Sequence, residues 1–317
     1  MVRVAVVGTG MMARGIAACC AAGGDHDVII YGRSQSSLDA GVSAACELQK
    51  FLVSNGVAAA VQGSIRGVLS LEECVKDAAF VFESIVEDLE AKRALFRELG
   101  ELCGAEQRLC TNTSSLSVTA IAEAMEGTDR FAAAHFIGPA HLVPLVEVCP
   151  APGTSPATLA AVKGFLESIG KRPVLLKREI QGFIAARLQA ALYREAMHLV
   201  EEGVADPSAV DGAVVNGFGR RLNQIGPFTQ GDFAGVDLIQ RTHATFFPQL
   251  GAYQRDVRAD ALVASGRCGV KSGAGSYEWP SERVREVAGR RDAELLRRLR
   301  EDRESSPKRR RSDSGGS

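Results

Sequence analysis

The 317-residue sequence lacks three features that would place it among membrane, zinc-binding or nucleic-acid-binding proteins. No apolar run approaches the roughly 18 residues that a membrane-spanning helix needs. The eight cysteines form no C-x-x-C pair and have no histidine cluster nearby, which excludes a zinc site and a disulfide framework. Charge of one sign is also missing, because 37 basic and 38 acidic residues leave a net charge of -1. We therefore expect a cytoplasmic protein without a metal site, whose partner is a small molecule rather than a membrane or a nucleic acid.

One basic cluster departs from this balance, at Lys308, Arg309, Arg310 and Arg311. In isolation such a cluster resembles a nuclear-localisation or nucleic-acid patch. Serines and glycines surround it, and the rest of the chain is close to neutral, so residues 305–317 are predicted to form a disordered, solvated tail. Nucleic-acid binding through this tail stays a weak alternative function.

Strand and helix patterns alternate through the first half of the chain. Val2 to Val7 is an apolar, mostly β-branched run, which is typical of a buried parallel strand. A helix from Met11 to Ala22 and a strand from Asp27 to Tyr31 complete a βαβ unit. Later strands are expected at 79–84, 108–111, 130–136, 145–148 and 173–176, with helices at 87–99, 118–125 and 156–168.

Beyond Arg178 the patterns are mostly helical, and residues 284–299 could form an exposed amphipathic helix. The sequence therefore predicts an α/β fold in which a doubly wound Rossmann sheet over residues 1–179 precedes an all-α domain over residues 180–304.

The turn after the first strand reads G-T-G-M-M-A from Gly8 to Ala13. The first glycine permits a tight turn, the second lets a pyrophosphate approach the backbone, and a small third residue lets the helix pack on the strand. The G-x-G-x-x-A pattern alone is weak evidence, but here it follows a strand and opens a helix. We predict a dinucleotide-binding turn that includes Gly8, Gly10, Met11, Met12 and Ala13.

The end of the second strand bears on which dinucleotide binds. A carboxylate there usually accepts hydrogen bonds from the ribose of NAD, whereas this sequence has Arg33 and Ser34. A guanidinium beside hydroxyl groups suits a 2'-phosphate, so we expect Arg33 and Ser34, with Ser36 as a further candidate, to favour NADP(H) over NAD(H). The alternative is that Arg33 is an ordinary solvated loop residue.

Polar side chains follow two later strands. Asn112 to Leu116 reads N-T-S-S-L, and its hydroxyl groups are expected at the carboxyl edge of the sheet, where ligands bind in this architecture; the serines could equally cap the next helix. His135 ends one strand, and Glu147 lies in the apolar strand that follows it, where a carboxylate needs a partner. If the strands are neighbours, Glu147 can orient His135 as a general base, although a purely structural pair has the same appearance.

These motifs, taken in order, resemble those of the L-3-hydroxyacyl-CoA dehydrogenase family. The match continues through Q-G-F-I at 181–184, I-G-P-F at 225–228 and G-V-K-S-G at 269–273. The stretch from Glu201 to Pro227 is especially similar to the branch that contains lambda-crystallin, a gulonate dehydrogenase.

The resemblance implies a role for each matching residue. His135 would be the general acid or base, Glu147 would orient it, and Ser114 would hydrogen-bond the reacting oxygen. Glu87 and Lys92 would contact the nicotinamide half of the cofactor, and Asn112 is a further candidate cofactor contact. The family also pairs its helical domains into a homodimer.

Two departures from the family pattern concern the substrate. The family motif H-F-F-N-P is here H-F-I-G-P, with Gly138 in place of asparagine, and the motif P-G-F-x-x-N-R is here Q-G-F-I-A-A-R, with Ala186 in place of asparagine. Both amides lie near the substrate in the family, so a site without them should bind the usual acyl thioester less well.

We therefore expect an oxidoreductase that transfers a hydride between NADP(H), or NAD(H), and a 3-hydroxyacyl thioester or related 3-hydroxy acid. The thioester carrier would be coenzyme A or an acyl carrier protein. The alternative from another class is a non-catalytic, cofactor-binding protein of the crystallin or regulatory kind.

Overall fold

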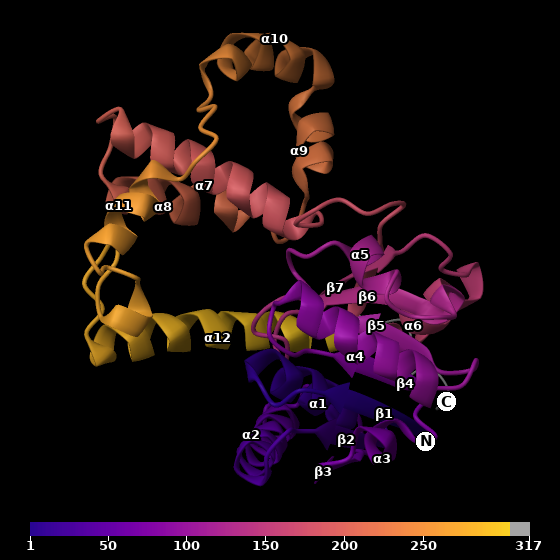
Figure 1. Cartoon of the computed structure of the whole chain (residues 1–317). Coiled ribbons are helices and arrows are strands. Elements are labelled where there is room, and N and C mark those ends of the chain that lie inside the picture. The colour runs from indigo at the N-terminus through magenta and orange to yellow at the C-terminus, as the bar shows by residue number, and fades with distance from the viewer. Residues whose placement is uncertain (305–317) are drawn as a thin grey trace, which may run out of the picture. The chain divides into compact units, whose positions relative to one another are not determined.

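The computed structural model of the chain describes residues 1–304 and divides into two compact units. The first unit comprises Met1–Ile184 together with the described residues from Gly289 onward, and the second comprises Ala185–Ala288. The predicted fold class, a Rossmann sheet followed by a helical domain, is confirmed (Figure 1). The basic cluster and the tail predicted over residues 305–317 lie outside the described residues.

The first unit is built on one sheet of eight strands in the order β3-β2-β1-β4-β5-β6-β7-β8. All neighbouring strands are parallel except β6 and β7, which are antiparallel. The strands are β1 Val2–Val7, β2 His26–Tyr31, β3 Ser64–Val68, β4 Phe80–Glu83, β5 Arg108–Thr111, β6 Phe131–Phe136, β7 Leu145–Pro150 and β8 Arg172–Leu175.

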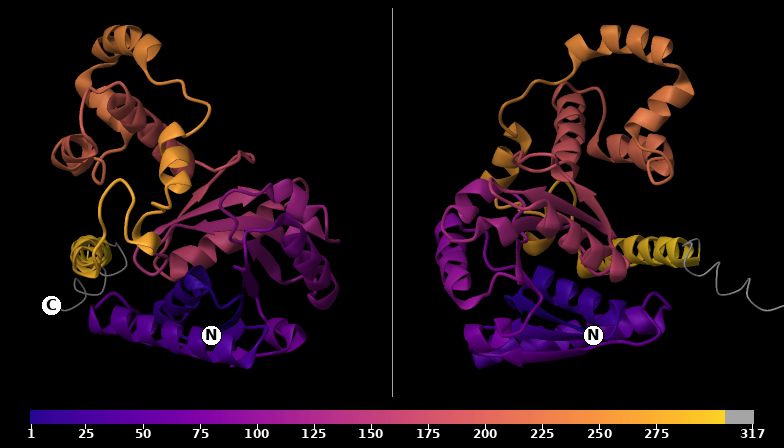
Figure 2. Two further views of the ribbon diagram at one scale, coloured as in Figure 1. Left: turned by 60° about the vertical axis from the view of Figure 1, so that its left-hand side comes forward. Right: turned by 90° about the vertical axis from the view of Figure 1, so that its right-hand side faces the viewer.

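Helices cover both faces of this sheet, and two apolar clusters hold them there (Figures 1 and 2). Alternate residues of a strand point to opposite faces, so Val4 and Val6 of β1 join one cluster while Ala5 and Val7 join the other. The first cluster includes residues of α1 Met11–Gly23, α2 Gln35–Ser54 and α6 Pro156–Ser168. The second includes residues of α3 Leu71–Val75, α4 Leu89–Leu102 and α5 Val118–Ala122.

The strand order reverses between β1 and β4, and this reversal positions the candidate cofactor site. The chain runs outward from β1 to β3 on one side and from β4 to β8 on the other. Ligands of doubly wound sheets bind at the carboxyl ends of the strands beside such a switch point. The turn after β1 and the residues after β4 meet there, since Ser84 N donates to Val7 O at 2.9 Å.

Several elements differ from the sequence prediction. The prediction named no element between residues 35 and 75, where the structure has α2, β3 and α3. β3 is an edge strand with three of its five residues exposed, so it lacks the apolar run that marked the buried strands. α5 ends at Ala122 rather than near residue 125.

The regular elements of the second unit are all helices. Its α-helices are α7 Ala185–Glu201, α8 Pro207–Asn216, α9 Pro227–Ala234, α10 Val236–Phe246 and α11 Val257–Ala264. No residue of α8, α9, α10 or α11 is buried, and Met197 is the one buried residue of α7. As described, these helices enclose almost no apolar core of their own.

The last described helix, α12 Ser281–Glu304, is longer than the predicted 284–299, and its residues from Gly289 to Glu304 belong to the first unit. Leu296 packs there on Ala22, Leu52 and Leu142. Arg300 donates from Nε to the carbonyl oxygen of Asn55, which is the C-cap of α2, at 2.8 Å. A guanidinium at a helix C-terminus satisfies carbonyl groups that have no helical partner. No helix within residues 1–304 combines the length and apolar character needed to cross a membrane.

Candidate active site

The turn between β1 and α1 contains two glycines with different roles. Gly8 has a φ of +126°, and a Cβ atom there would lie 2.4 Å from the carbonyl oxygen of Ser84, so only glycine fits. At Gly10 a Cβ would meet no atom within 4 Å, and this residue caps α1 without a side-chain hydrogen bond. The first N–H groups of α1 are therefore uncapped by a side chain beside open space, an arrangement that suits a pyrophosphate.

A cavity of about 910 Å³ lies beside this turn. Residues that follow β1, β2 and β4 line it, together with part of α4. The predicted Gly8, Gly10, Arg33 and Ser34 all line this cavity. Its volume lies in the range of pockets that bind small molecules and cofactors.

The β2 end of the cavity carries hydroxyl groups and one guanidinium. Ser34 is the N-cap of α2, and its Oγ lies 2.9 Å from Oγ of Ser37, which also lines the cavity. Ser36, the further candidate of the sequence prediction, does not line the cavity. Arg33 is exposed and forms no ion pair or side-chain hydrogen bond within the described part of the chain.

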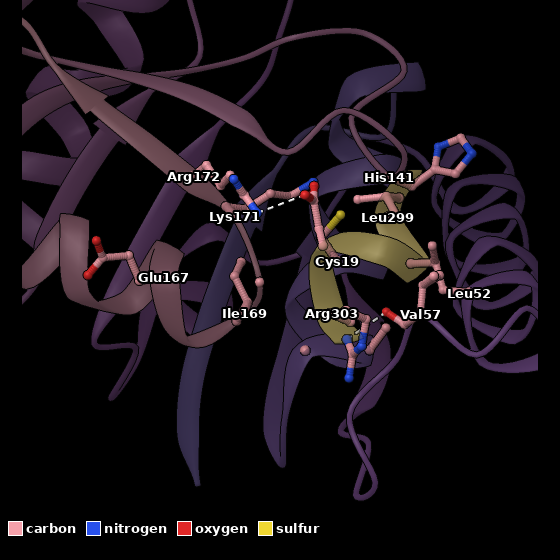
Figure 3. Close-up of a pocket in the computed structure, with 14 residues that line it drawn as sticks. Cys19, Leu52, Val57, His141, Glu167, Ile169, Lys171, Arg172, Leu299 and Arg303 are labelled. Atoms are coloured by element: carbon pink, nitrogen blue, oxygen red, sulfur yellow. Dashed lines mark hydrogen bonds and ion pairs between the residues drawn. The ribbon is translucent and has the colours of Figure 1, made fainter. Parts of the chain in front are cut away.

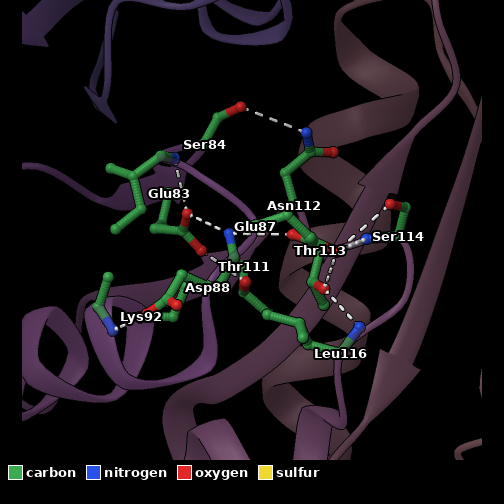
Figure 4. Close-up of polar contacts among 12 residues, drawn as sticks. Glu83, Ser84, Glu87, Asp88, Lys92, Thr111, Asn112, Thr113, Ser114 and Leu116 are labelled. Carbon is green, nitrogen blue, oxygen red and sulfur yellow. Dashed lines mark hydrogen bonds and ion pairs between the residues drawn. The ribbon is translucent and has the colours of Figure 1, made fainter.

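Glu87 organises the turn that follows β5 (Figure 4). Its Oε1 accepts hydrogen bonds from Thr113 Oγ1 at 2.7 Å and from the backbone N–H groups of Ser114 and Ser115, each at 2.9 Å. Partial burial raises the pKa of Glu87, but these hydrogen bonds and the nearby Lys92 ammonium outweigh it and lower the pKa to about 2. The predicted Ser114 is thus held beside the predicted Glu87, and its hydroxyl also donates to Oε1 at 3.3 Å.

Lys92 is buried against a second carboxylate that the sequence analysis did not single out. Its Nζ lies 2.6 Å from Oε1 of Glu83 and 3.5 Å from Oε2 of Glu87. Glu83 is fully buried and also accepts from Thr111 Oγ1 at 2.6 Å (Figure 4). Lys92 is 1 % exposed, so its main contact is the buried carboxylate of Glu83. Its predicted contact with a cofactor stays a prediction.

Asn112 connects the ends of three strands. Its Nδ2 donates to Ser84 Oγ after β4 at 3.3 Å, and its Oδ1 accepts from the backbone N–H of Phe136 in β6 at 2.8 Å. Both ends of the amide are used, so Asn112 sets the spacing of the strand ends that carry the candidate site.

His135 and Glu147 lie directly opposite each other on antiparallel strands β6 and β7. Nδ1 of His135 is 3.0 Å from Oε2 of Glu147, and the two residues are 7 % and 1 % exposed. A buried carboxylate needs partners, and Oε1 of Glu147 accepts a second hydrogen bond from the backbone N–H of Ile184 at 2.8 Å. A carboxylate at Nδ1 favours the tautomer with the proton on that nitrogen.

Phe183 completes the surroundings of His135. Their ring centroids are 5.1 Å apart at an interplanar angle of 29°, which is a stacked arrangement. The Q-G-F-I motif was part of the family resemblance, but nothing local in the sequence indicates that Phe183 reaches His135.

A second, smaller cavity of about 300 Å³ contains none of the predicted site residues (Figure 3). Several of its polar side chains are already engaged, since Lys171 Nζ donates to Val143 O at 3.0 Å and Arg172 pairs with Asp302 at 2.8 Å. Within residues 1–304 no group of three or more His, Cys, Asp or Glu side chains could hold a metal ion.

Comparison with protein families gives two adjacent matches. The family described as "3-hydroxyacyl-CoA dehydrogenase, NAD binding domain" matches residues 3–180, and "3-hydroxyacyl-CoA dehydrogenase, C-terminal domain" matches residues 182–279.

Individual relatives agree with these matches. A 5-formyl-3-hydroxy-2-methylpyridine 4-carboxylate 5-dehydrogenase of Mesorhizobium japonicum is 30% identical and covers 95% of this chain and 99% of its own. A probable 3-hydroxybutyryl-CoA dehydrogenase of Deinococcus radiodurans is 33% identical over 86% of this chain and 99% of its own. A crystal structure of the pyridine-carboxylate enzyme, described as an NAD+-dependent dismutase, superposes with a TM-score of 0.89 at 27% identity and covers 96% of this chain and 99% of that one.

The lowered pKa of Glu87 predicts a pH-dependent contribution to stability. A carboxyl group whose pKa falls from 4.5 to about 2 on folding stabilises the protein above pH 4.5, and this stabilisation is lost as the pH falls toward 2. At pH 7, Glu87→Gln should lower the free energy of unfolding by about 1 kcal/mol, a modest value because the carboxylate is half-buried. Thermal melts from pH 7 to pH 3 should show that the difference in Tm between Glu87→Gln and wild type shrinks below pH 5. An unchanged difference in Tm at pH 3 would contradict the lowered pKa of Glu87.

Proposed function

Because the chain belongs to the 3-hydroxyacyl-CoA dehydrogenase family, we propose that it transfers a hydride between NADP(H) and the carbon bearing a hydroxyl group beta to a carboxyl or thioester. The observation that carries this proposal is the buried pair of His135 and Glu147 at the carboxyl end of β6. A histidine oriented by a carboxylate is the usual device for moving a proton to or from a hydroxyl group.

His135 is the proton-transfer residue in this mechanism. With Nδ1 bonded to Glu147, Nε2 takes the proton of the substrate hydroxyl during oxidation and returns it during reduction. Glu147 stabilises the charged imidazolium form that exists between these steps. The nicotinamide ring, when bound, accepts or supplies the hydride.

Ser114 hydrogen-bonds the reacting oxygen in the same mechanism. Its present side-chain bond to Glu87 is 3.3 Å long, close to the limit for a hydrogen bond, so the hydroxyl can turn to a substrate oxygen at small cost. Glu87 stays bonded to Thr113 and to two backbone N–H groups while Ser114 turns. Glu87, Lys92 and Asn112 are proposed to shape the nicotinamide end of the cofactor site.

The residues around the large cavity fit a dinucleotide. The open space at Gly10 and the uncapped start of α1 suit a pyrophosphate, and Met11, Met12 and Ala13 supply the first residues of that helix. Arg33, with Ser34 and Ser37, would hold a 2'-phosphate at the far end. The absence of a carboxylate among Tyr31, Gly32, Arg33 and Ser34 removes the group that would repel that phosphate.

We propose that the site binds the usual acyl thioester of the family less well, because two of the family's amide groups are missing here. Gly138 and Ala186 remove two amide groups, and a Cβ at Gly138 would meet only Sδ of Met12, at 3.7 Å. The relative from Mesorhizobium japonicum is named for a pyridine carboxylate, so the fold also serves substrates that are not thioesters. A free 3-hydroxy acid and a thioester on coenzyme A or acyl carrier protein are the candidate substrates.

We also propose that the helical unit forms a homodimer. Large apolar side chains of this unit are exposed, among them Phe228 at 90 % and Phe233 at 80 %, while helices α8 to α11 bury none of their residues. A unit of about 100 residues without a core needs an apolar partner surface to be stable. A second copy of this chain presents such a surface, because its own helical unit has the same unburied side chains.

Light scattering after size-exclusion chromatography tests the dimer. The expected mass is twice that of one chain. The double variant Phe228→Asp, Phe233→Asp should shift the measured mass toward that of a single chain. A wild-type mass of one chain would overturn the dimer.

The reaction is tested by the absorbance of reduced nicotinamide, with acetoacetyl-CoA and free acetoacetate each offered with NADPH or NADH. Turnover should occur with NADPH at a kcat/KM about tenfold or more above that with NADH. Tight NADPH binding with no turnover of any 3-oxo compound would favour the non-catalytic alternative.

Arg33→Asp gives the matched test of cofactor choice. Replacing the guanidinium by a carboxylate should change the NADPH to NADH ratio of kcat/KM by about 100-fold in favour of NADH, with little change in thermal stability because Arg33 is exposed. An unchanged ratio would show that Arg33 is a solvated loop residue.

A further inference from the structure

Residues 179–184, between β8 and α7, have an unusual backbone. Gly182 and Phe183 both have positive φ values, +77° and +49°. Glycine adopts this conformation readily, but for a bulky side chain it is strained and persists only when the surroundings hold it. Phe183 is nevertheless 2 % exposed, so its ring is held firmly in the core of the first unit.

The C-terminal end of this segment contacts both His135 and Glu147. The Phe183 ring stacks on the His135 ring, and the next residue, Ile184, donates its backbone N–H to Glu147 Oε1. A single hydrogen bond at Nδ1 leaves an imidazole free to tilt about that bond, whereas a ring packed on its face removes the tilt. The bond from Ile184 likewise prevents the Glu147 carboxylate from rotating, because the other oxygen is bonded to His135.

The other end of the segment holds the turn that contains Ser114. Gln181 Nε2 donates to the carbonyl oxygen of Ser115 at 3.2 Å. The carboxylate of Glu179 accepts from the backbone N–H groups of Val118 and Thr119, at 2.7 and 2.9 Å, and so fixes the start of α5. Gln181 stands where the related motif has proline, and because proline's ring has no donor, the bond to Ser115 depends on this chain's own residue.

We infer that residues 179–184 act as a brace, which fixes His135, Glu147 and the Ser114 turn relative to one another, with Phe183 as a positioning residue. The inference rests on the proposed function for its kinetic consequences, but its structural consequence is independent of turnover. The strained backbone at Phe183 is the local condition that places the ring on His135 and the Ile184 N–H on Glu147 at the same time. A displacement of about 1 Å at a proton-transfer residue is enough to slow catalysis 100-fold.

The test compares Phe183→Leu with Phe165→Leu. Leucine keeps an apolar side chain at position 183 but removes the stacked ring. Phe165 is a matched control, because it is 6 % exposed and stacks on Phe80 at 4.3 Å, in the other apolar cluster. Both variants should lose stability to a similar degree. Only Phe183→Leu should lower kcat, by about 10- to 100-fold, with KM and the cofactor Kd within about threefold of wild type.

The second readout is the Nδ1–H proton resonance of His135 in cofactor-bound protein labelled with 15N-histidine, identified by its absence in His135→Gln. The brace predicts that this resonance broadens or disappears in Phe183→Leu, as the unstacked ring exchanges its proton with water, and stays sharp in Phe165→Leu and Phe183→Tyr. An unchanged resonance in folded Phe183→Leu overturns the brace even if the wild type turns over no substrate. Absence of turnover with the predicted resonance change would instead count against the proposed reaction.

Gln181→Met serves as a variant that should fold, because Gln181 is exposed. It removes the donor to Ser115 at nearly constant volume. The expected result is a kcat about 3- to 10-fold lower, and when it is combined with Phe183→Leu the two effects should be non-additive. Full additivity would mean that the two ends of the segment act separately and would overturn the single brace.

Discussion

The candidate site depends on one constraint, the burial of the Glu147 carboxylate inside a hydrophobic sheet. A charged group that is 1 % exposed must be fully bonded, and its two oxygens are bonded to His135 and to the backbone of Ile184. The single antiparallel pairing in the sheet, between β6 and β7, places Glu147 directly opposite His135. Removing the carboxylate would therefore free both the histidine and the segment before α7.

Two carboxylates at the same edge of the sheet, Glu83 and Glu87, have different roles. Glu83 is fully buried and neutralised by Lys92, so it is a structural group. Glu87, four residues later, lies at a cluster of N–H and O–H donors that keep it charged, and its donors include the candidate substrate contact Ser114. Two carboxylates on one short segment thus have different environments, one that supports the fold and one that faces the site.

The sequence was sufficient to predict features that depend on local patterns, and it was insufficient to predict features that depend on tertiary contacts. The apolar run of β1 and the glycine turn predicted the first βαβ unit, and the helix predicted over residues 156–168 has the bounds of α6. The pairing of His135 with Glu147 followed from a carboxylate in an apolar strand beside a short turn. β3 was missed because an edge strand has no apolar run, and the roles of Glu83 and Phe183 were missed because their partners lie on other elements. The end of α12 packs on α2, and no periodic pattern encodes that contact.

The most direct test of the account is the rate of hydride transfer in Glu147→Gln, measured by single-turnover absorbance with NADPH and a 3-oxo substrate that the wild type reduces. Glutamine keeps the size of the side chain and can still accept from Ile184, but its amide donates to Nδ1 and so favours the wrong tautomer of His135. The account predicts a rate at least about 100-fold below wild type, with the NADPH Kd unchanged within about threefold. A rate within threefold of wild type would show that the His135–Glu147 pair is structural and that proton transfer occurs elsewhere.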